Sequence, residues 1–344
     1  SLAFNEPQAR YRLASIATTA TRDGDDWILN GRKGFVLNGG TSNLLIVPAR
    51  TSGDTDDERG ITLFAVAADS GGLACNAYAT IDGLRAAEVT LDEVRVSHDT
   101  VLGETDNGFP DLDATIDEAT LAICAEAVGI MQVLKDKTVE YSKDRSQFGV
   151  PIGSFQELQH RMVDMLMACE QAQSLLMWAV MASESGSADN KRAVSSIKYL
   201  VSSAGRALGE DAIQIHGGMG VTWELDVAHY FKRLTAIGTL LGDADWHLDK
   251  LASSSQQALT GAMFPLAMVV FFAGNQELLW FTTLFVDLGC TLVLYRLFGK
   301  VGLQVAIAVA IILANLQGPK LTVIFGLQTS LGVIYYSSIF FATD

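Results

Sequence analysis

Two short segments of this chain bring together residue types that could hold a diphosphate. Arg145 carries a planar guanidinium, whose rigid fork suits a pyrophosphate, and it lies just before Phe148 and a glycine turn. Further along, Gln214 precedes a run of glycines that includes Gly217 and Gly218. Because glycine has no side chain, it lets the backbone approach a ligand closely. The two segments therefore predict a diphosphate-binding pocket.

Each segment also has a purely structural explanation. Arg145 could form a surface ion pair with Asp144 or Asp164, and the glycines could form a plain turn between two helices. The histidines lack the spacing of metal ligands relative to one another or to cysteine, so we expect hydrogen-bonded structural roles and no metal site for His160, His216 and His229.

The net negative charge of the chain comes entirely from its first three-quarters. The net charge is −15, yet the mean hydropathy is +0.26. Residues 260–344 contain three basic and three acidic residues, so residues 1–259 carry 21 basic and 36 acidic residues. An acidic surface lacks the basic footprint of a nucleic-acid-binding protein, so we expect no nucleic-acid partner. The composition indicates an acidic, water-soluble part joined to an apolar one.

The cysteines are far apart, and each lies in an apolar run. Without CxxC spacing they predict neither a disulfide framework nor a zinc site. We therefore expect reduced core thiols, and a cytosolic environment for the soluble part, from Cys75, Cys124, Cys169 and Cys290.

Residues 1–105 have the pattern of a small β domain. Apolar runs at 14–21 and 27–30 flank a turn-rich segment at 22–25, which predicts a hairpin. Short strands at such spacing indicate a small barrel or sandwich, and we expect the barrel. Further strands separated by turn residues are predicted at 43–47, 60–67, 72–80 and 87–91.

Over residues 106–253 the apolar period becomes helical. From Phe155 to Leu176, apolar residues recur every three or four positions and form one stripe. The segments 116–141, 188–215 and 227–251 behave similarly, so we expect a four-helix bundle.

The remaining residues have a different character. Residues 254–277 read as a linker, and the apolar runs at 278–298, 301–316 and 321–341 approach membrane-spanning length. We predict about three helices of a partial transmembrane domain over 278–344. The expected fold is thus multi-domain α+β, with a small β-barrel, a four-helix bundle and an all-α transmembrane hairpin-type segment.

Taken in order, the motifs at Arg145 and Gln214 resemble the FAD-binding half of the acyl-CoA dehydrogenases, with matches over about 141–251. The resemblance implies a middle β-domain over 1–105, a C-terminal bundle over 106–253 and an FAD cofactor held between them. It implies that Arg145 contacts the FAD diphosphate across a dimer and that Phe148 packs near the adenosine. The other side of that pocket is expected to be lined by Gln214, Gly217 and Gly218.

The β-domain carries weaker matches to the same family. Asn5 begins an Asn-Glu-Pro box where the family usually has a Thr-Glu-Pro box near the flavin ring. Trp27 lies in a segment similar to the family's hairpin that covers the flavin, with Leu29 at a position often filled by a hydroxyl. The resemblance makes Trp27 a cofactor-binding candidate, and a core aromatic is the equal alternative.

The residue that would remove the substrate's α-proton is not identified by the sequence. Many relatives have a glutamate where this chain has Ile237 or Gly238, and other relatives place it near Glu118. Asp243 lies a few residues after Ile237 and Gly238 and is a further candidate. For each of these acids, a solvated carboxylate on a helix face is the favoured alternative.

The resemblance also implies partners. These are an acyl-CoA substrate, an electron-transferring flavoprotein, and either a homo-oligomer or a second dehydrogenase subunit, since the chain resembles small-subunit pimeloyl-CoA dehydrogenases. The family's N-terminal helical domain is expected to be absent, which would impair activity. The alternative is a catalytically inactive flavoprotein subunit.

The apolar part resembles the first three helices of queuosine precursor transporters over about 275–344, with polar residues at membrane depth that include Asn315 and Lys320. This implies a membrane partner for the tail, in the inner (plasma) membrane, and a transporter fragment as an alternative function. The positive residues Arg296 and Lys300 mark the loop after the first strong span as cytoplasmic, which would place the flavin domain outside. We therefore favour a gene-model or assembly chimera, that is, a chimeric fusion that the natural protein does not contain, over a membrane-tethered enzyme.

Overall fold

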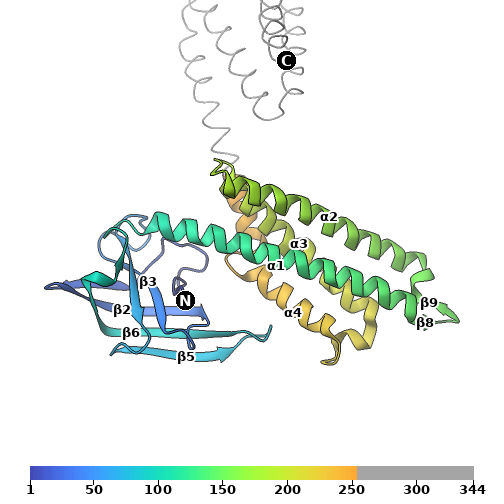
Figure 1. Ribbon diagram of the computed structural model, residues 1–344, viewed down its shortest axis with the longest axis horizontal. Helices are drawn as coiled ribbons and strands as arrows, with labels where there is room; N and C mark the ends of the chain where they lie inside the picture. Colours follow the sequence, from blue (N-terminus) through green and yellow to red (C-terminus); the bar gives the residue numbers. More distant parts are fainter. Residues whose placement is uncertain (254–344) are drawn as a thin grey trace, which may run out of the picture. The chain divides into compact units, whose positions relative to one another are not determined.

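The computed structural model describes residues 1–253. Residues Ser1–Ala252 form one compact unit, in which a β-domain precedes a helical bundle (Figure 1). Within the described part of the chain, no helix is both long enough and apolar enough to span a bilayer. The expected linker over 254–277, the transporter-like segment over 278–344 with its membrane partner, and Cys290 all lie outside the described residues.

The β-domain is one seven-stranded mixed sheet with the order β5-β6-β2-β1-β3-β4-β7. The predicted hairpin is confirmed, since β1 and β2 pair antiparallel around Gly24, which has a φ of 63°. Only the pairing of β1 with β3 is parallel among the described strands. The strands are β1 (Thr19–Asp23), β2 (Asp26–Leu37), β3 (Leu44–Arg50), β4 (Ile61–Ala67), β5 (Leu73–Ala79), β6 (Arg85–Ser97) and β7 (Val101–Leu102).

The predicted closed barrel is wrong. Within residues 1–253, the edge strands β5 and β7 pair with β6 and β4 alone, so the sheet is open. β7 has two residues, and β5 leaves most of its side chains exposed. A barrel would need these two edges to meet, and a two-residue edge offers little to pair with.

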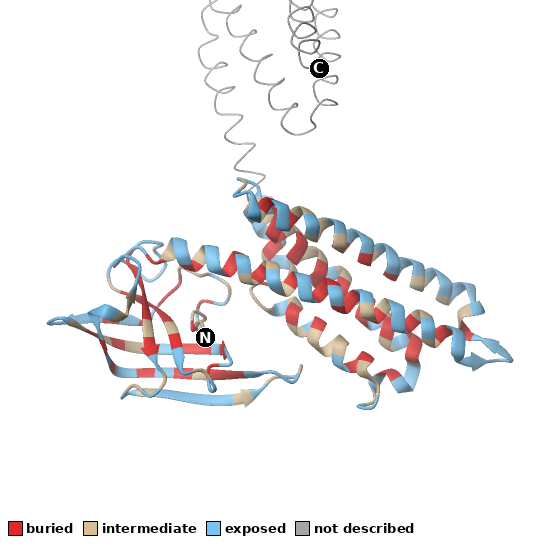
Figure 2. Ribbon diagram, viewed as in Figure 1, coloured by how far each residue is buried: buried red, intermediate tan, exposed pale blue. Residues whose placement is uncertain are grey.

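The expected four-helix bundle is confirmed, and its helices bury apolar stripes against one another (Figure 2). The sequence explains this packing because small and aliphatic residues recur at helical spacing on the inward faces. A two-stranded hairpin of β8 (Ser146–Gln147) and β9 (Val150–Pro151) connects the first two helices. The helices are α1 (Phe109–Asp144), α2 (Gln156–Glu184), α3 (Asn190–His216) and α4 (Asp226–Thr239).

The single helix expected over 227–251 is broken after α4. Leu241 and Gly242 have positive φ angles of 55° and 108°, which no α-helix accommodates. The break is held by the fully buried Lys198 on α3, whose Nζ donates to the Gly242 carbonyl at 2.6 Å and to Ser202 Oγ at 3.0 Å. His247 Nε2 lies 3.0 Å from the Leu241 carbonyl oxygen, which can only accept, so the hydrogen bond between them has Nε2–H as its donor. Helical structure resumes at residue 244.

The buried His247 predicts a specific loss of stability in acid. Burial lowers its pKa from 6.5 to about 4, so between these pH values the unfolded chain binds a proton that the folded chain does not. The free energy of unfolding is therefore expected to fall as pH drops from 6.5 to 4, by up to about 3 kcal/mol from this residue. Urea unfolding of the wild type and of His247→Gln across this range checks the result. Parallel pH profiles of the two proteins would contradict it.

A cluster of charged residues ties the β-domain to the bundle. Arg233 on α4 donates through Nε and Nη2 to both carboxylate oxygens of Glu126 on α1, at 2.6 and 2.7 Å. Its Nη1 donates to Asp82, in the turn between β5 and β6, at 2.7 Å. The Asp82 side chain is almost fully buried, and Arg233 is partly buried. A guanidinium shared by two carboxylates in this way fixes the position of the hairpin on the bundle.

One expectation about the cysteines is wrong. Cys124 and Cys169 are buried core thiols as predicted, but Cys75 is exposed. It lies on β5, the edge strand, where the apolar sequence pattern does not translate into a covered face.

Candidate functional site

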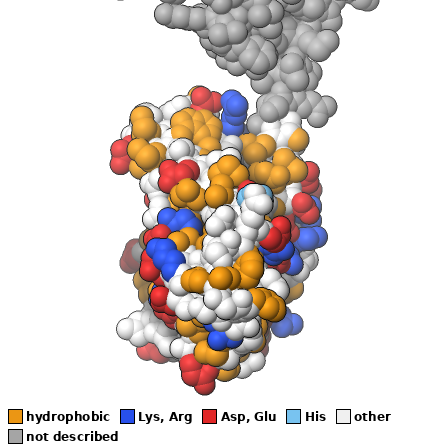
Figure 3. Space-filling model, turned by 90° about the vertical axis from the view of Figure 1, so that its right-hand side faces the viewer, with side chains coloured by type: hydrophobic (Ala, Val, Ile, Leu, Met, Phe, Trp, Pro, Cys, Tyr) orange, Lys and Arg blue, Asp and Glu red, His pale blue; other side chains and the backbone are white. Residues whose placement is uncertain are grey.

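The two segments that began the sequence analysis meet at one end of the bundle. A cavity of about 650 Å³ lies where the end of α1, the β8–β9 hairpin, the start of α2 and the end of α3 come together. This end of the bundle faces the viewer in Figure 3, where hydrophobic side chains lie among charged ones. The lining includes five predicted cofactor-binding residues, Arg145, Phe148, Gln214, Gly217 and Gly218.

Arg145 presents an exposed guanidinium at this cavity. It follows the last residue of α1, and its backbone N–H caps the helix by donating to the Tyr141 carbonyl at 2.9 Å. Within residues 1–253 its side chain forms no ion pair, so the alternative pairing with Asp144 or Asp164 is not observed. An unpaired guanidinium on the wall of a cavity is available to bind an anionic ligand.

The glycines leave the opposite wall open. Gly217 ends α3 with a φ of 61°, so it serves as the helix–helix turn of the alternative explanation. At Gly217 and Gly218, an added Cβ would meet no atom within 4 Å. Gln214 is exposed on the last turn of α3. The turn thus ends the helix and also leaves the space beside Gly217 and Gly218 free of other atoms.

Two residues at the base of the cavity were not singled out as ligand contacts by the sequence. The rings of Tyr141 and His216 stack with their centroids 4.3 Å apart. The Tyr141 hydroxyl donates to the His216 carbonyl at 3.3 Å, and His216 Nδ1 lies 2.8 Å from the Ala212 carbonyl. The only sequence signal was the proximity of each residue to a motif. Their stacking holds the end of α1 against the end of α3.

Phe148 is the most exposed apolar residue at this cavity, with 93% of its surface accessible. It lies in the β8–β9 turn with a positive φ of 56°. Its ring packs edge-on against the ring of Phe155, with the two ring centroids 6.2 Å apart. A non-glycine residue in this conformation is uncommon and points the ring away from the bundle core. The exposed ring is suited to packing on a flat ligand or on another protein surface.

The other predicted cofactor residue, Trp27, lies elsewhere. It is buried in the core of the β-domain, 6% exposed, and packs edge-on against Phe64. It does not line the cavity at Arg145. This is the environment of the alternative interpretation, a core aromatic.

Strand β2 does expose an aromatic, but at Phe35. The pairing of β2 with β6 slips between Lys33 and Val36, so the strand bulges there, and Phe35 has a φ of 52°. As a result Lys33, Gly34 and Val36 are buried while Phe35 is 38% exposed. A bulge re-aims a side chain out of the regular alternation, which is why the sequence pattern did not identify Phe35.

The positions considered for the base lie in different environments. Ile237 is completely buried in the bundle core, whereas an added Cβ at Gly238 would meet only the Ser202 carbonyl, at 3.9 Å. Glu118 is exposed on α1. Asp243 accepts the Trp246 N–H at 2.9 Å and lies 3.7 Å from Arg10. The structure brings none of them to the cavity at Arg145.

The described residues fit a cofactor that contains a diphosphate and an aromatic group. The guanidinium, the open glycine turn and the exposed phenyl ring surround a single cavity. Among residues 1–253, no group of three or more histidine, cysteine or acidic side chains is arranged to hold a metal ion.

Comparison with known protein families identifies both domains. Residues 1–94 match the acyl-CoA dehydrogenase middle domain, and residues 106–255 match the acyl-CoA dehydrogenase C-terminal domain. The chain belongs to the acyl-CoA dehydrogenase family. Residues 256–344 lie outside both of the ranges matched to this acyl-CoA dehydrogenase family.

Individual acyl-CoA dehydrogenase relatives support the assignment. The chain is 35% identical, over 67% of its length and 60% of the relative's, to a probable acyl-CoA dehydrogenase fadE25 of Mycobacterium leprae. It is 30% identical to a 3-(aryl)acrylate reductase of Clostridium sporogenes, over 74% of this chain and 68% of that protein. The solved structure of PigA with FAD and proline superposes with a TM-score of 0.70 at 25% identity, covering 74% and 67% of the two chains. The chain thus spans about 60% of the first of these curated relatives.

Proposed function

We propose that this chain is the flavin-binding portion of an FAD-dependent acyl-CoA dehydrogenase. Such an enzyme removes hydrogens from the α and β carbons of an acyl-CoA thioester. The observation that carries the proposal is the cavity in which an unpaired Arg145 faces the open glycines Gly217 and Gly218. The family membership supports FAD as the ligand, and the related PigA structure holds FAD.

In this proposal Arg145 binds the diphosphate of FAD, with Gln214 and the glycine backbone on the opposite side. Phe148 packs against the adenosine. Asn5 and a residue of β2 position the flavin ring. Since Trp27 is buried in the core, we assign the aromatic contact on β2 to Phe35, the exposed aromatic of that strand. When bound, FAD accepts the hydride from the substrate.

The length of α1 supports the participation of a second chain. α1 has 36 residues, which at about 1.5 Å each make it about 54 Å long. Its first residue, Phe109, packs against the same apolar cluster as Leu2 and Phe4 of the β-domain, and its last residue precedes Arg145. Figure 1 shows one end of α1 at the β-domain and the other at the β8–β9 hairpin. An FAD whose ring lies near Asn5 cannot reach Arg145 of the same molecule. We therefore propose that another copy, or a second dehydrogenase subunit, supplies the diphosphate-binding end.

Membership of the acyl-CoA dehydrogenase family supports the remaining partners. An acyl-CoA is the substrate, and an electron-transferring flavoprotein receives the electrons. Within the described residues, the base at the usual position is replaced by the apolar Ile237 or by Gly238. Glu118 and Asp243 are the candidate bases.

A second function is favoured by one observation, the complete burial of Ile237 among apolar residues. A chain without a base at that place would be a catalytically inactive flavoprotein subunit of a dehydrogenase complex. Reduction of an artificial electron acceptor by acyl-CoA separates the two functions. Turnover by the chain alone supports the dehydrogenase, and bound flavin without turnover supports the inactive subunit.

The full-length protein is expected to purify with a yellow chromophore that has flavin absorbance. Acid release of the chromophore followed by chromatography should identify FAD. If the folded protein is colourless and does not take up added FAD, the proposal is wrong. Size-exclusion chromatography with light scattering should give a dimer or larger assembly when FAD is bound.

A further inference from the structure

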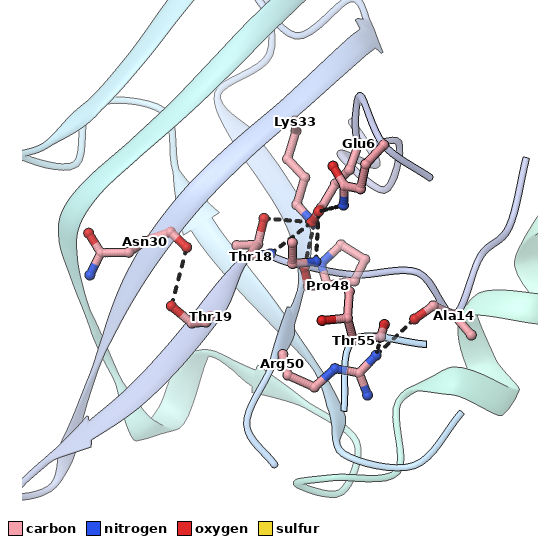
Figure 4. A network of polar contacts seen from close by, with 11 residues as sticks. Glu6, Ala14, Thr18, Thr19, Asn30, Lys33, Pro48, Arg50 and Thr55 are labelled. Atoms are coloured by element: carbon pink, nitrogen blue, oxygen red, sulfur yellow. Dashed lines mark hydrogen bonds and ion pairs between the residues drawn. The ribbon is translucent and has the colours of Figure 1, made fainter. Parts of the chain in front are cut away.

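Two segments that are distant in sequence are joined by a buried ion pair in the β-domain (Figure 4). Lys33 on β2 has no exposed side-chain surface, and the Glu6 side chain is 2% exposed. The Lys33 Nζ donates to Glu6 Oε1 at 2.6 Å and to the Pro48 carbonyl at 2.7 Å. A direct contact of this kind links the N-terminal Asn-Glu-Pro box to the strand that bears the bulge.

The Glu6 carboxylate has a full set of hydrogen-bond donors. It accepts from the Thr18 N–H at 3.1 Å, the Thr18 hydroxyl at 2.6 Å, the Ala17 N–H at 2.8 Å and Gln8 Nε2 at 2.6 Å. Burial alone would raise the pKa of Glu6, but the Lys33 charge and these hydrogen bonds lower it. Burial lowers the pKa of Lys33 to about 8. Both groups are therefore mainly charged at neutral pH.

The residues next to this pair are the ones assigned to the flavin ring. The Asn5 carbonyl accepts the Gly34 N–H at 2.8 Å, so the two backbones touch immediately beside Glu6 and Lys33. Phe35 follows Gly34 and is turned outward by the bulge. The ion pair and the Gly34 hydrogen bond thus hold Asn5 and Phe35 at a fixed separation.

We propose that Glu6 and Lys33 are positioning residues for the flavin ring. They hold the Asn-Glu-Pro box against the bulge of β2, so that Asn5 and Phe35 form one preformed surface before FAD binds. Neither side chain touches the cofactor, because both are buried beneath that surface. A buried ion pair is a weak source of net stability, but a single arrangement satisfies both charges. This inference rests on the proposed function, since that function assigns the ring to this surface.

The test compares Lys33→Met with Lys198→Met in the full-length protein. Lys198 is a matched control because it is also fully buried and its ammonium donates to a carbonyl and a hydroxyl, but it lies in the bundle. Hydrogen exchange at the Gly34 amide needs no cofactor and reports the contact with Asn5 directly. We expect this exchange to be about a hundredfold faster in Lys33→Met than in Lys198→Met, because Lys33→Met leaves the buried Glu6 carboxylate without its cation.

The flavin provides the second measurement. We expect Lys33→Met to shift the absorbance maximum of bound flavin and to weaken FAD binding about tenfold, beyond any effect of Lys198→Met. Glu6→Gln keeps an oxygen that can accept from Lys33, and it should fall between the wild type and Lys33→Met in both measurements. It also provides a second variant if Lys33→Met does not accumulate.

The outcomes separate the inference from the proposed function. If the wild type takes up no FAD, the proposed function fails, whatever the exchange at Gly34. If the wild type binds FAD and both Lys33→Met and Glu6→Gln keep slow exchange at Gly34 with an unchanged flavin spectrum, the positioning role is wrong and the proposed function stands. Equal changes in Lys33→Met and Lys198→Met would also overturn the positioning role, because they would reflect a general loss of stability.

Discussion

Replacing Arg145 by alanine is expected to weaken FAD binding by roughly 10- to 100-fold, which is the range for losing hydrogen bonds to a charged group. The guanidinium is exposed at the cavity and has no ion-pair partner among residues 1–253, so its removal should not disturb the fold. Titration of the FAD-free protein with FAD, followed by flavin fluorescence, measures the change. The thermal unfolding midpoint without FAD should be that of the wild type.

Two further substitutions sharpen the result for Arg145. Arg145→Lys keeps the charge but loses the planar fork, so its binding defect should be smaller than that of alanine. Arg206→Ala is the matched control because Arg206 is an exposed arginine on α3 that pairs with Glu210. It should bind FAD like the wild type. An Arg145→Ala protein with wild-type affinity would rule out the assigned diphosphate contact.

Placing a glutamate at Ile237 is expected to destabilise the fold by about 3 kcal/mol or more at neutral pH, since a buried carboxylate would have no partner charge. Ile237 is completely buried in the apolar cluster of the bundle. Burial would raise the pKa of the new carboxyl above that of the unfolded chain, so the penalty should shrink as pH falls towards 4. Urea unfolding at pH 7 and pH 5 measures both effects.

Gly238→Glu is the matched variant for this substitution. Its Cβ would meet only the Ser202 carbonyl, at 3.9 Å, so we expect a change in unfolding free energy within about 1 kcal/mol of zero. If Ile237→Glu is as stable as the wild type and also gains acyl-CoA turnover, the site at residue 237 is open to substrate, and the buried environment described here is wrong. Turnover gained in Gly238→Glu alone would instead support the inactive-subunit function for the native chain.

Local patterns in the sequence predicted most of the elements. The hairpin around Gly24 and the helices α1 to α3 follow from turn residues and from apolar spacing, which act between neighbours in the chain. The break after Thr239 was missed because apolar spacing continues through it, whereas the buried Lys198 and His247 that hold it come from separate segments. The closed barrel was wrong for a similar reason, since closure depends on whether two distant edge strands meet.

The candidate site was predictable at the bundle and less so in the β-domain. Arg145 and the glycine turn occur in short motifs with distinctive chemistry, and the structure brings them to one cavity. Trp27 was chosen because of its residue type, but the strand alternation turns it into the core. Phe35 is exposed because of a bulge, which depends on how β2 pairs with β6 rather than on the residue itself.

The sequence by itself determined the family motifs, the order of the β-domain and bundle, and the placement of charge, because these depend on residue types and on spacing along one segment. Only the tertiary structure decided that the sheet stays open, that Glu6 pairs with Lys33, and that Arg145 lies at the opposite end of α1 from the β-domain. Each of these results depends on contacts between residues far apart in the chain. Such contacts are set by strand register and by which end of α1 packs on the β-domain, and no single segment of the sequence specifies either of them.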